Sequence, residues 1–448
     1  MSNTKNLTEG KIMGTLLHFA VPVFFTLFLQ ALYGGVDLLV VGQFAQTADV
    51  SGVSSGSMLL STVTMIVTGV SMGITVLVGE MIGKGEPESA GKAIGSGICL
   101  FAVGAVILSV FLIFGADILA GFLHAPQEAF ELTAVYIRIC GAGAVFIIAY
   151  NVLGAVFRGI GDSKTPLITV IVACVVNIVG DVLLVAGFHM GTAGAALATV
   201  AAQGVSVIAS FFIIRKRNLP FRMKKEYIRF DGQLIGKELK IGIPVALQEF
   251  LVGISFLVIQ TIVNTFGVTA SAAVGVGEKL CSFLMLVPSA YMQSMSAFVA
   301  QNRGAGKMSR AREALRDGML TAFLVGVVMA YLAFFHGDML AGIFAKDPAV
   351  IVEAQSYLKA YAIDCMLTPL LFCFIGYYNG CEKTVFVMIQ GLIGAFGVRI
   401  PVVYAISRIP GVSLFGIGLG TPASSVVQIL LCIGMFVWME KQEKRKSV

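Results

Sequence analysis

The chain has 448 residues, of which 57% are hydrophobic and only 12% are charged. Because soluble domains usually carry about 25% charged residues, there are too few charges here to cover a water-exposed surface. The composition therefore excludes soluble globular, disordered, collagen-like and disulfide-scaffold proteins, and it favours a membrane protein.

Long apolar stretches follow one another along the whole chain. A membrane-spanning helix needs roughly 20 apolar residues, and a scan for such stretches between polar breaks predicts twelve helices. The first begins just after Lys11 and is too long for a cleaved signal peptide, so we interpret it as a membrane helix. The predicted spans lie near 14–40, 51–79, 93–115, 130–157, 165–187, 192–214, 239–264, 271–299, 317–336, 353–378, 384–406 and 413–438.

Lysine and arginine residues gather in the loops after the even-numbered spans and in the C-terminal tail. Positive residues stay on the cytoplasmic side of a membrane, which predicts that both termini are cytoplasmic and explains the net charge of +6 without nucleic acid. The densest basic segment, 215–238, divides the spans six and six. We predict an N-terminal six-helix lobe at 1–214, a cytoplasmic basic linker at 215–238 and a C-terminal six-helix lobe at 239–448.

The two halves resemble each other in sequence. Segments Val78–Ile94 and Val299–Leu315 share five identical residues at a constant offset of 221, and the first span of each half carries a proline near its start, Pro22 or Pro244. An even number of spans in each half gives both halves the same orientation. The expected fold is therefore all-α, with two pseudo-symmetric six-helix bundles related by an axis along the membrane normal and a central cleft.

Ionisable residues inside membrane spans are costly and mark functional sites. Asp37 follows a long uncharged stretch in span 1, and Asn177 and Asp181 stand one helical turn apart in span 5, on the same helix face. Two carboxylates and an amide offer hard oxygen ligands for Na+, and a close carboxyl pair can also share a proton. The alternative is a buried hydrogen-bonded pair that only locks helices together.

Span 1 also contains residues that favour bending. Pro22 lies in its first turns, and Gly34 and Gly35 come just before Asp37. Proline and glycine in membrane helices are typical of a kink or of close packing. We expect a bendable helix that bears the key acid.

The second half carries intramembrane charges of mixed sign. Two interpretations stay open for them: structural salt bridges that line the cleft, or a second coupling site. The residues are Glu249, Glu278, Lys279, Asp364 and Arg399.

The sequence shows no Walker A loop, no metal-ligand spacing of histidines and cysteines, and no arguable catalytic triad. We therefore predict a protein that is not an enzyme and has no cofactor. The eight cysteines are scattered through apolar segments, and we expect free thiols.

The chain resembles the MATE family of multidrug and toxic compound extrusion transporters over essentially its whole length. The resemblance rests on the two six-span halves, QALYGGVDLLVVGQF in span 1, VGEMIGKGE after span 2, and FRGIGDSKTP and NIVGD around span 5. It implies an antiporter that exports amphipathic organic cations in exchange for Na+ or H+. It also implies that Asp37, Asn177 and Asp181 match the cation-site positions of the N-terminal lobe, whereas Glu249 and Asp364 do not match the C-terminal lobe in register.

The alternative within the same superfamily is a lipid-linked oligosaccharide flippase. Such flippases tend to have cationic cavities, and spans 1 to 6 contain only Arg138 among lysines and arginines. A channel or receptor is a further class, against which the duplication and the buried acids argue. We expect a monomer in the bacterial cytoplasmic membrane whose partners are lipids and small organic cations, and not nucleic acid.

Overall fold

A computed structural model describes residues 7–216, 219–220 and 223–446, which contain helices and no strands. Predicted basic residues at positions 5, 217 and 222 lie outside the described residues. The helices are α1 (Ile12–Phe44), α2 (Thr47–Gly83), α3 (Pro87–Phe122), α4 (Phe130–Ala142), α5 (Ala144–Gly159), α6 (Lys164–Asp181), η1 (Val182–Gly187), α7 (Gly191–Lys216), η2 (Lys225–Tyr227), α8 (Gly232–Asn264), α9 (Val268–Leu284), α10 (Leu286–Gly304), α11 (Met308–Phe335), α12 (Gly337–Gly342), α13 (Pro348–Gly380), α14 (Thr384–Leu392), η3 (Ile393–Arg399), α15 (Ile400–Ser407), α16 (Leu414–Gly418) and α17 (Gly420–Lys446).

In the described part of the chain, eleven helical segments are long and apolar enough to cross a membrane, and a bent pair brings the number to twelve. The predicted twelve-span, all-helical fold is thereby confirmed. The bent pair is α4 and α5, which the sequence analysis treated as one span, 130–157. The helices meet at an angle of 56° around Gly143, where a β-carbon would stand 2.4 Å from the Val200 side chain.

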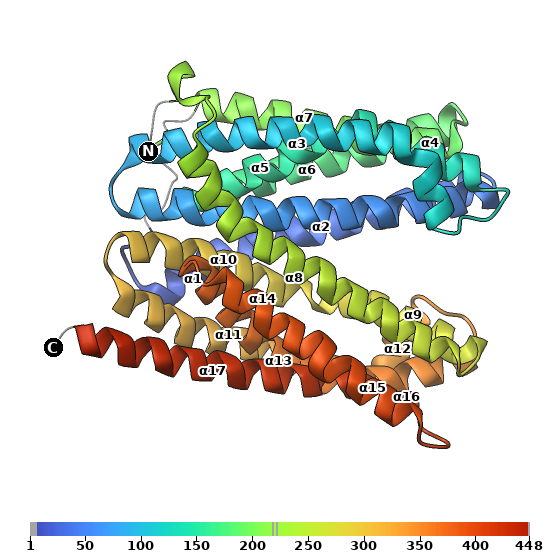
Figure 1. Cartoon of the computed structure of the whole chain (residues 1–448). Coiled ribbons are helices and arrows are strands. Elements are labelled where there is room, and N and C mark those ends of the chain that lie inside the picture. Colours follow the sequence, from blue (N-terminus) through green and yellow to red (C-terminus); the bar gives the residue numbers. More distant parts are fainter. Residues whose placement is uncertain (1–6, 217–218, 221–222, 447–448) are drawn as a thin grey trace. The chain divides into compact units, whose positions relative to one another are not determined.

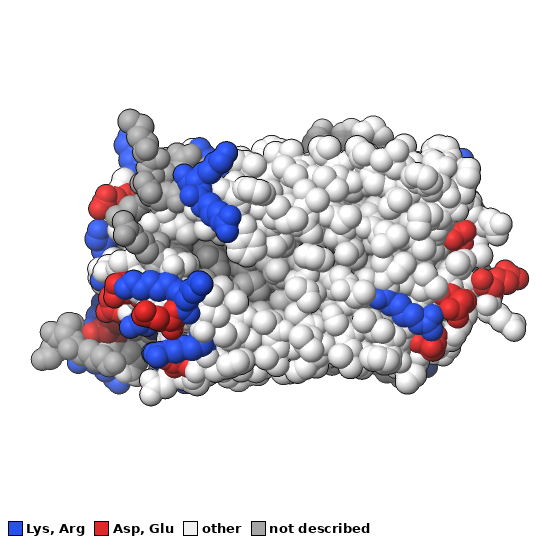
Figure 2. All heavy atoms as spheres, turned by 90° about the horizontal axis from the view of Figure 1, so that it is seen from above, with Lys and Arg blue, Asp and Glu red and all other residues white. Residues whose placement is uncertain are grey.

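Many large apolar side chains on the outside of the helices are exposed. On α3, Phe114, Ile118 and Phe122 are 77–80% exposed and stand on one helix face at i, i+4 and i+8. Such a stripe is too apolar for water and fits lipid. Figure 2 shows charged side chains gathered toward the ends of the helices, with a wide uncharged band between them.

The chain folds into two compact units. Unit 1 comprises 1–10, 17–246 and 300–307, and unit 2 comprises 11–16, 247–299 and 308–448. Helices α1 and α8 (Figure 1) therefore each contribute to both units. Each helix contains a proline, Pro22 or Pro244, close to the position at which it passes from one unit to the other, 16/17 in α1 and 246/247 in α8. The lobe and linker boundaries inferred from sequence stay a prediction, although 232–238 of the predicted linker form the first turns of α8.

Small residues hold α2 and α8 together in unit 1. A β-carbon on Gly69 would stand 2.6 Å from Cα of Ala246, and β-carbons on Gly73 and Gly242 would meet backbone oxygens of the facing helix. This spacing of small residues four apart is the one that lets membrane helices approach at backbone distance. The N-terminal half of α8 is thus fixed against α2.

The sequence repeat recurs in the turns of the structure. Gly85 after α2 and Gly306 after α10 both have positive φ, 74° and 71°. Because only glycine adopts this conformation without strain, the matching glycines of the repeat are explained by identical turns.

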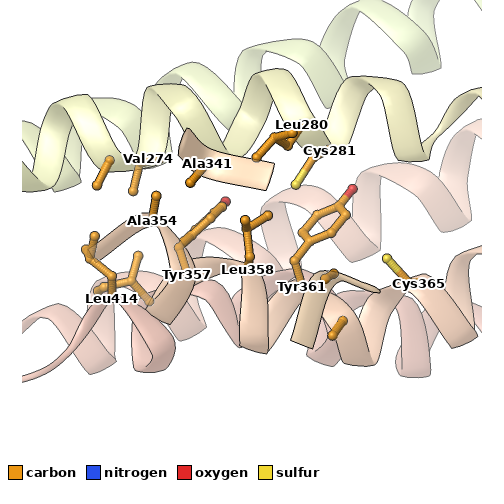
Figure 3. Close-up of a cluster of buried hydrophobic side chains, with 14 of the residues drawn as sticks. Val274, Leu280, Cys281, Ala341, Ala354, Tyr357, Leu358, Tyr361, Cys365 and Leu414 are labelled. Atoms are coloured by element: carbon orange, nitrogen blue, oxygen red, sulfur yellow. The ribbon is translucent and has the colours of Figure 1, made fainter. Parts of the chain in front are cut away.

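Helix α13 is the centre of unit 2. Figure 3 shows Tyr357, Leu358 and Tyr361 of this helix pointing toward Leu280 and Cys281 of α9. A glycine on α9, Gly277, makes room for the Tyr357 ring, since a β-carbon there would stand 2.6 Å from it. The cysteines of the chain are all free, as expected, and all but Cys99 are buried.

Candidate functional site

The three polar residues predicted from spans 1 and 5 come together inside unit 1. The carboxyl of Asp37 on α1 lies beside the side chains of Asn177 and Asp181 on α6. Asp37 is 5% exposed, and Asn177 and Asp181 are completely buried. Helical spacing explains why Asn177 and Asp181 lie together, because residues four apart share a helix face. The approach of α1 to α6, which brings Asp37 to them, is a tertiary contact.

The local backbone explains how α6 and α7 present their side chains to this site. Asp181 is the last residue of α6 before the π-helical turn η1, and turns of this type are frequent at functional sites. Its neighbour Gly180 packs against Ala198 of α7, at 3.0 Å between the two β-carbon positions. This close approach brings the next residue of α7, Thr199, to the site.

Thr199 is a member of the site that the sequence analysis did not identify. Its hydroxyl donates a hydrogen bond of 3.1 Å to Oδ2 of Asp37. Tyr136 and Gln203 lie close by and are also buried. Thr199 and Gln203 match Ser424 and Gln428 in the internal repeat, which was the one available signal for them.

Several buried polar atoms of the site have no hydrogen-bond partner among the described residues. Both oxygens of Asp181, both polar atoms of the Asn177 amide and Oδ1 of Asp37 are buried without a hydrogen-bond partner in the described structure. Each such atom normally costs about 1–3 kcal/mol when it stays unsatisfied, and the cation-site and structural-lock interpretations both stay predictions. The arrangement suits a group that arrives from outside, such as a small cation or a proton.

The polar atoms of the site are mostly oxygens. Among the residues that the structure describes, no group of three or more His, Cys, Asp or Glu is placed to hold a metal ion. Two carboxylates, an amide oxygen and a hydroxyl instead offer the oxygen ligands that hard cations prefer. The same two carboxyls can share a proton.

Of the residues in α1 that we expected to favour bending, Pro22 is buried, whereas Gly34 and Gly35 are free of close contacts. Pro22 lies inside the helix, and its carbonyl accepts a hydrogen bond of 2.8 Å from the Thr26 hydroxyl. β-Carbons on Gly34 and Gly35 would meet nothing within 4 Å. Close packing therefore does not explain these glycines, and a bendable helix stays a prediction.

Two of the five charged residues predicted in the second half, Asp364 and Arg399, are buried in unit 2. Asp364 accepts hydrogen bonds from Thr368 at 2.6 Å and Ser425 at 2.5 Å. Arg399 donates to Ser255 at 2.9 Å and stacks over Phe256, 4.4 Å from the ring centroid. The two charges attract each other, although no ion pair within 4.0 Å joins them among the described residues.

The remaining three charges of the second half are arranged differently. Glu278 is partly buried with one unpartnered oxygen, Lys279 is exposed, and Glu249 is partly buried. Arg158, one residue beyond the predicted span 130–157, lies in the last turn of α5 with its Nε buried. The salt-bridge and coupling interpretations of the second-half charges both stay predictions.

The chain matches one protein family over most of its length. The MatE family matches twice, over residues 22–183 and 244–405. The probable multidrug resistance protein YoeA of Bacillus subtilis is 26% identical, and the alignment covers 99% of this chain and 97% of that protein. The multidrug export protein MepA of Staphylococcus saprophyticus is 25% identical, with 90% and 89% covered.

Solved structures share the fold at low sequence identity. A crystal structure of MATE in complex with MaL6 matches with a TM-score of 0.92 and 17% identity, covering 99% of this chain and 100% of that one. An outward-facing multidrug resistance MATE family transporter of the MOP superfamily also matches with a TM-score of 0.92 and 17% identity, covering 99% of each chain. At this identity the likeness establishes the fold alone.

Proposed function

Because the chain belongs to the MatE family of transporters, we propose that it is a secondary active multidrug efflux antiporter. It exports amphipathic organic cations in exchange for Na+ or H+ by alternating access. The observation that carries the proposal is the buried Asp37, Asn177 and Asp181 cluster with its unsatisfied polar atoms. The names of the relatives YoeA and MepA support the multidrug substrate range.

The mechanism follows from the cost of a buried charge. A cation or proton that binds between Asp37 and Asp181 neutralises negative charge in a site with almost no access to water. Binding therefore favours the state in which the site is closed, and release favours the state in which it is hydrated. A ligand shifts such an equilibrium by its differential affinity for the two states.

Drug and cation do not need to touch each other in this scheme. They compete by stabilising different states, and the coupling between them is reciprocal. Thr199 positions the Asp37 carboxylate by its hydrogen bond, and Asn177 provides a neutral ligand beside it. An organic cation is the substrate class that two buried carboxylates favour electrostatically.

The experiment is efflux of a fluorescent organic cation from everted membrane vesicles, driven separately by an imposed Na+ gradient and by an imposed pH gradient. Movement of the dye under either gradient supports antiport, and the effective gradient identifies the coupling ion. Dye movement under neither gradient contradicts the proposal. The Asp37→Asn variant is the coupling-deficient control, and exposed Asp338→Asn is the matched neutral change.

The flippase alternative is not favoured. The relatives with which the chain aligns over nearly its full length are named for multidrug resistance or export. Counterflow of an organic cation in proteoliposomes, compared with movement of a lipid-linked oligosaccharide, separates the two activities.

A further inference from the structure

A second buried acid in unit 1 has no role in the proposed antiport site. Glu238 stands in the second turn of α8 and is completely buried. Both of its carboxyl oxygens lack a hydrogen-bond partner among the described residues. In the sequence, this residue is the last one of the predicted cytoplasmic linker, 215–238.

The carboxyl of Glu238 occupies a space that small residues create. A β-carbon on Gly97 of α3 would stand 3.3 Å from Oε2 of Glu238 and 2.8 Å from the Ile74 side chain of α2. A β-carbon on Gly73 would collide with the Glu238 carbonyl. Gly97 of α3 therefore leaves room for the carboxyl of Glu238, and Gly73 of α2 leaves room for the α8 backbone at the same residue.

Among the described residues, no salt bridge joins Glu238 to a basic side chain, and no charged group is recorded as acting on its carboxyl, including Arg158 of the neighbouring helix α5. The charged groups of α2, α3, the segment before α8 and residues 300–307 are engaged elsewhere or exposed. Glu80 pairs with Lys84 and Arg303, Lys307 donates to the Thr8 carbonyl, Asp231 accepts from backbone N–H groups of α8, and Lys92, Lys237 and Lys240 are exposed.

A proton is the cation that fits this environment. Na+ needs several oxygen ligands, and Gly97 and Ile74 beside the carboxyl offer none from their side chains. The nearby serine of α3, Ser96, is already bonded to the backbone of Asp231. A single proton makes the carboxyl neutral and removes the largest part of the burial penalty.

We propose that Glu238 is a second proton-binding site of unit 1, which holds a proton while the first turns of α8 pack on α2 and α3. The proton leaves only when water reaches the carboxyl, which requires this part of α8 to separate from the two helices. The site thus links proton release to the local packing of α8. It does not depend on Asp37 or on the identity of the coupling ion.

The test uses the full-length purified protein and the proton itself as ligand. Infrared absorption of protonated carboxyl groups is compared between wild type and Glu238→Gln at neutral pH. We expect the variant to lose the signal of one protonated carboxyl. The matched change Glu226→Gln, at an exposed position, is expected to lose none. An unchanged signal in Glu238→Gln would overturn the proposal, because Glu238 would then be ionised and held by water.

Thermal unfolding provides a second readout. Raising the pH from about 6 to about 9 is expected to lower the melting temperature of the wild type by removing the proton, and this part of the decline is absent in Glu238→Gln and Glu238→Met. The difference persists in an Asp37→Asn background. A decline parallel to wild type in both variants, disappearance of the difference in that background, or failure of both neutral replacements to fold would overturn the proposal.

Discussion

Replacing Asp37 by Asn removes the titratable group of the candidate site while preserving its size. We expect Asp37→Asn to fold and insert normally and to lose gradient-driven efflux. Asn cannot exchange a proton or supply a negative ligand, whereas its amide can donate to the unpartnered oxygens of Asp181. The melting temperature is therefore expected to equal or exceed that of wild type at neutral pH.

The size of the effect follows from the unsatisfied atoms. Five buried polar atoms of Asp37, Asn177 and Asp181 have no partner in the described structure. Four of the five are oxygens that a cation can satisfy, whereas Nδ2 of Asn177 is a hydrogen-bond donor. At about 1–3 kcal/mol each, the four unsatisfied oxygens cost at least about 4 kcal/mol, which is available to drive cation binding. A hundredfold fall in efflux needs the loss of only about 2.7 kcal/mol. We expect a fall of at least about a hundredfold.

The assay is dye efflux from everted vesicles at matched expression, with thermal unfolding of the purified variant measured in parallel. Asp338→Asn makes the same chemical change at an exposed position and is expected to behave as wild type. Wild-type efflux in Asp37→Asn would refute the assignment and direct attention to Glu249 and Asp364. Lost efflux together with a marked loss of stability would show that Asp37 is structural.

Further predictions concern topology, the second-half charges and helix packing. Cysteine labels near Lys224 and at the C-terminus are expected to react only from the cytoplasm, and labelling from outside would contradict the orientation. Arg399→Gln removes the positive charge that attracts Asp364 and the guanidinium hydrogen bond to Ser255, and it is expected to destabilise the protein by about 1–3 kcal/mol in thermal unfolding; lost transport at full stability would instead indicate a coupling role. Gly69→Ala would crowd the α8 backbone at 2.6 Å and is expected to cost about 1–3 kcal/mol, whereas Gly104→Ala, with nothing within 4 Å, is expected to gain about 0.5–1 kcal/mol. Equal melting temperatures for these two variants would show that α2 and α8 tolerate separation.

Local sequence information was sufficient for the helices and for part of the site. Hydropathy identifies the spans because every segment that crosses lipid must be apolar over its whole length, whatever its neighbours are. Helical periodicity likewise places Asn177 and Asp181 on one face. The bend between α4 and α5 escaped prediction, since it depends on the contact of Gly143 with Val200, a residue of another helix.

Contacts between distant parts of the chain were decided by the tertiary structure alone. Thr199 reaches Asp37 across 162 residues of sequence because Gly180 lets α6 and α7 approach closely. Glu238 stands between exposed Lys237 and Lys240, a pattern typical of a solvated linker, yet it is completely buried. Average hydropathy cannot detect one buried acid in a charged segment, because its burial depends on glycines of two other helices that leave room for it.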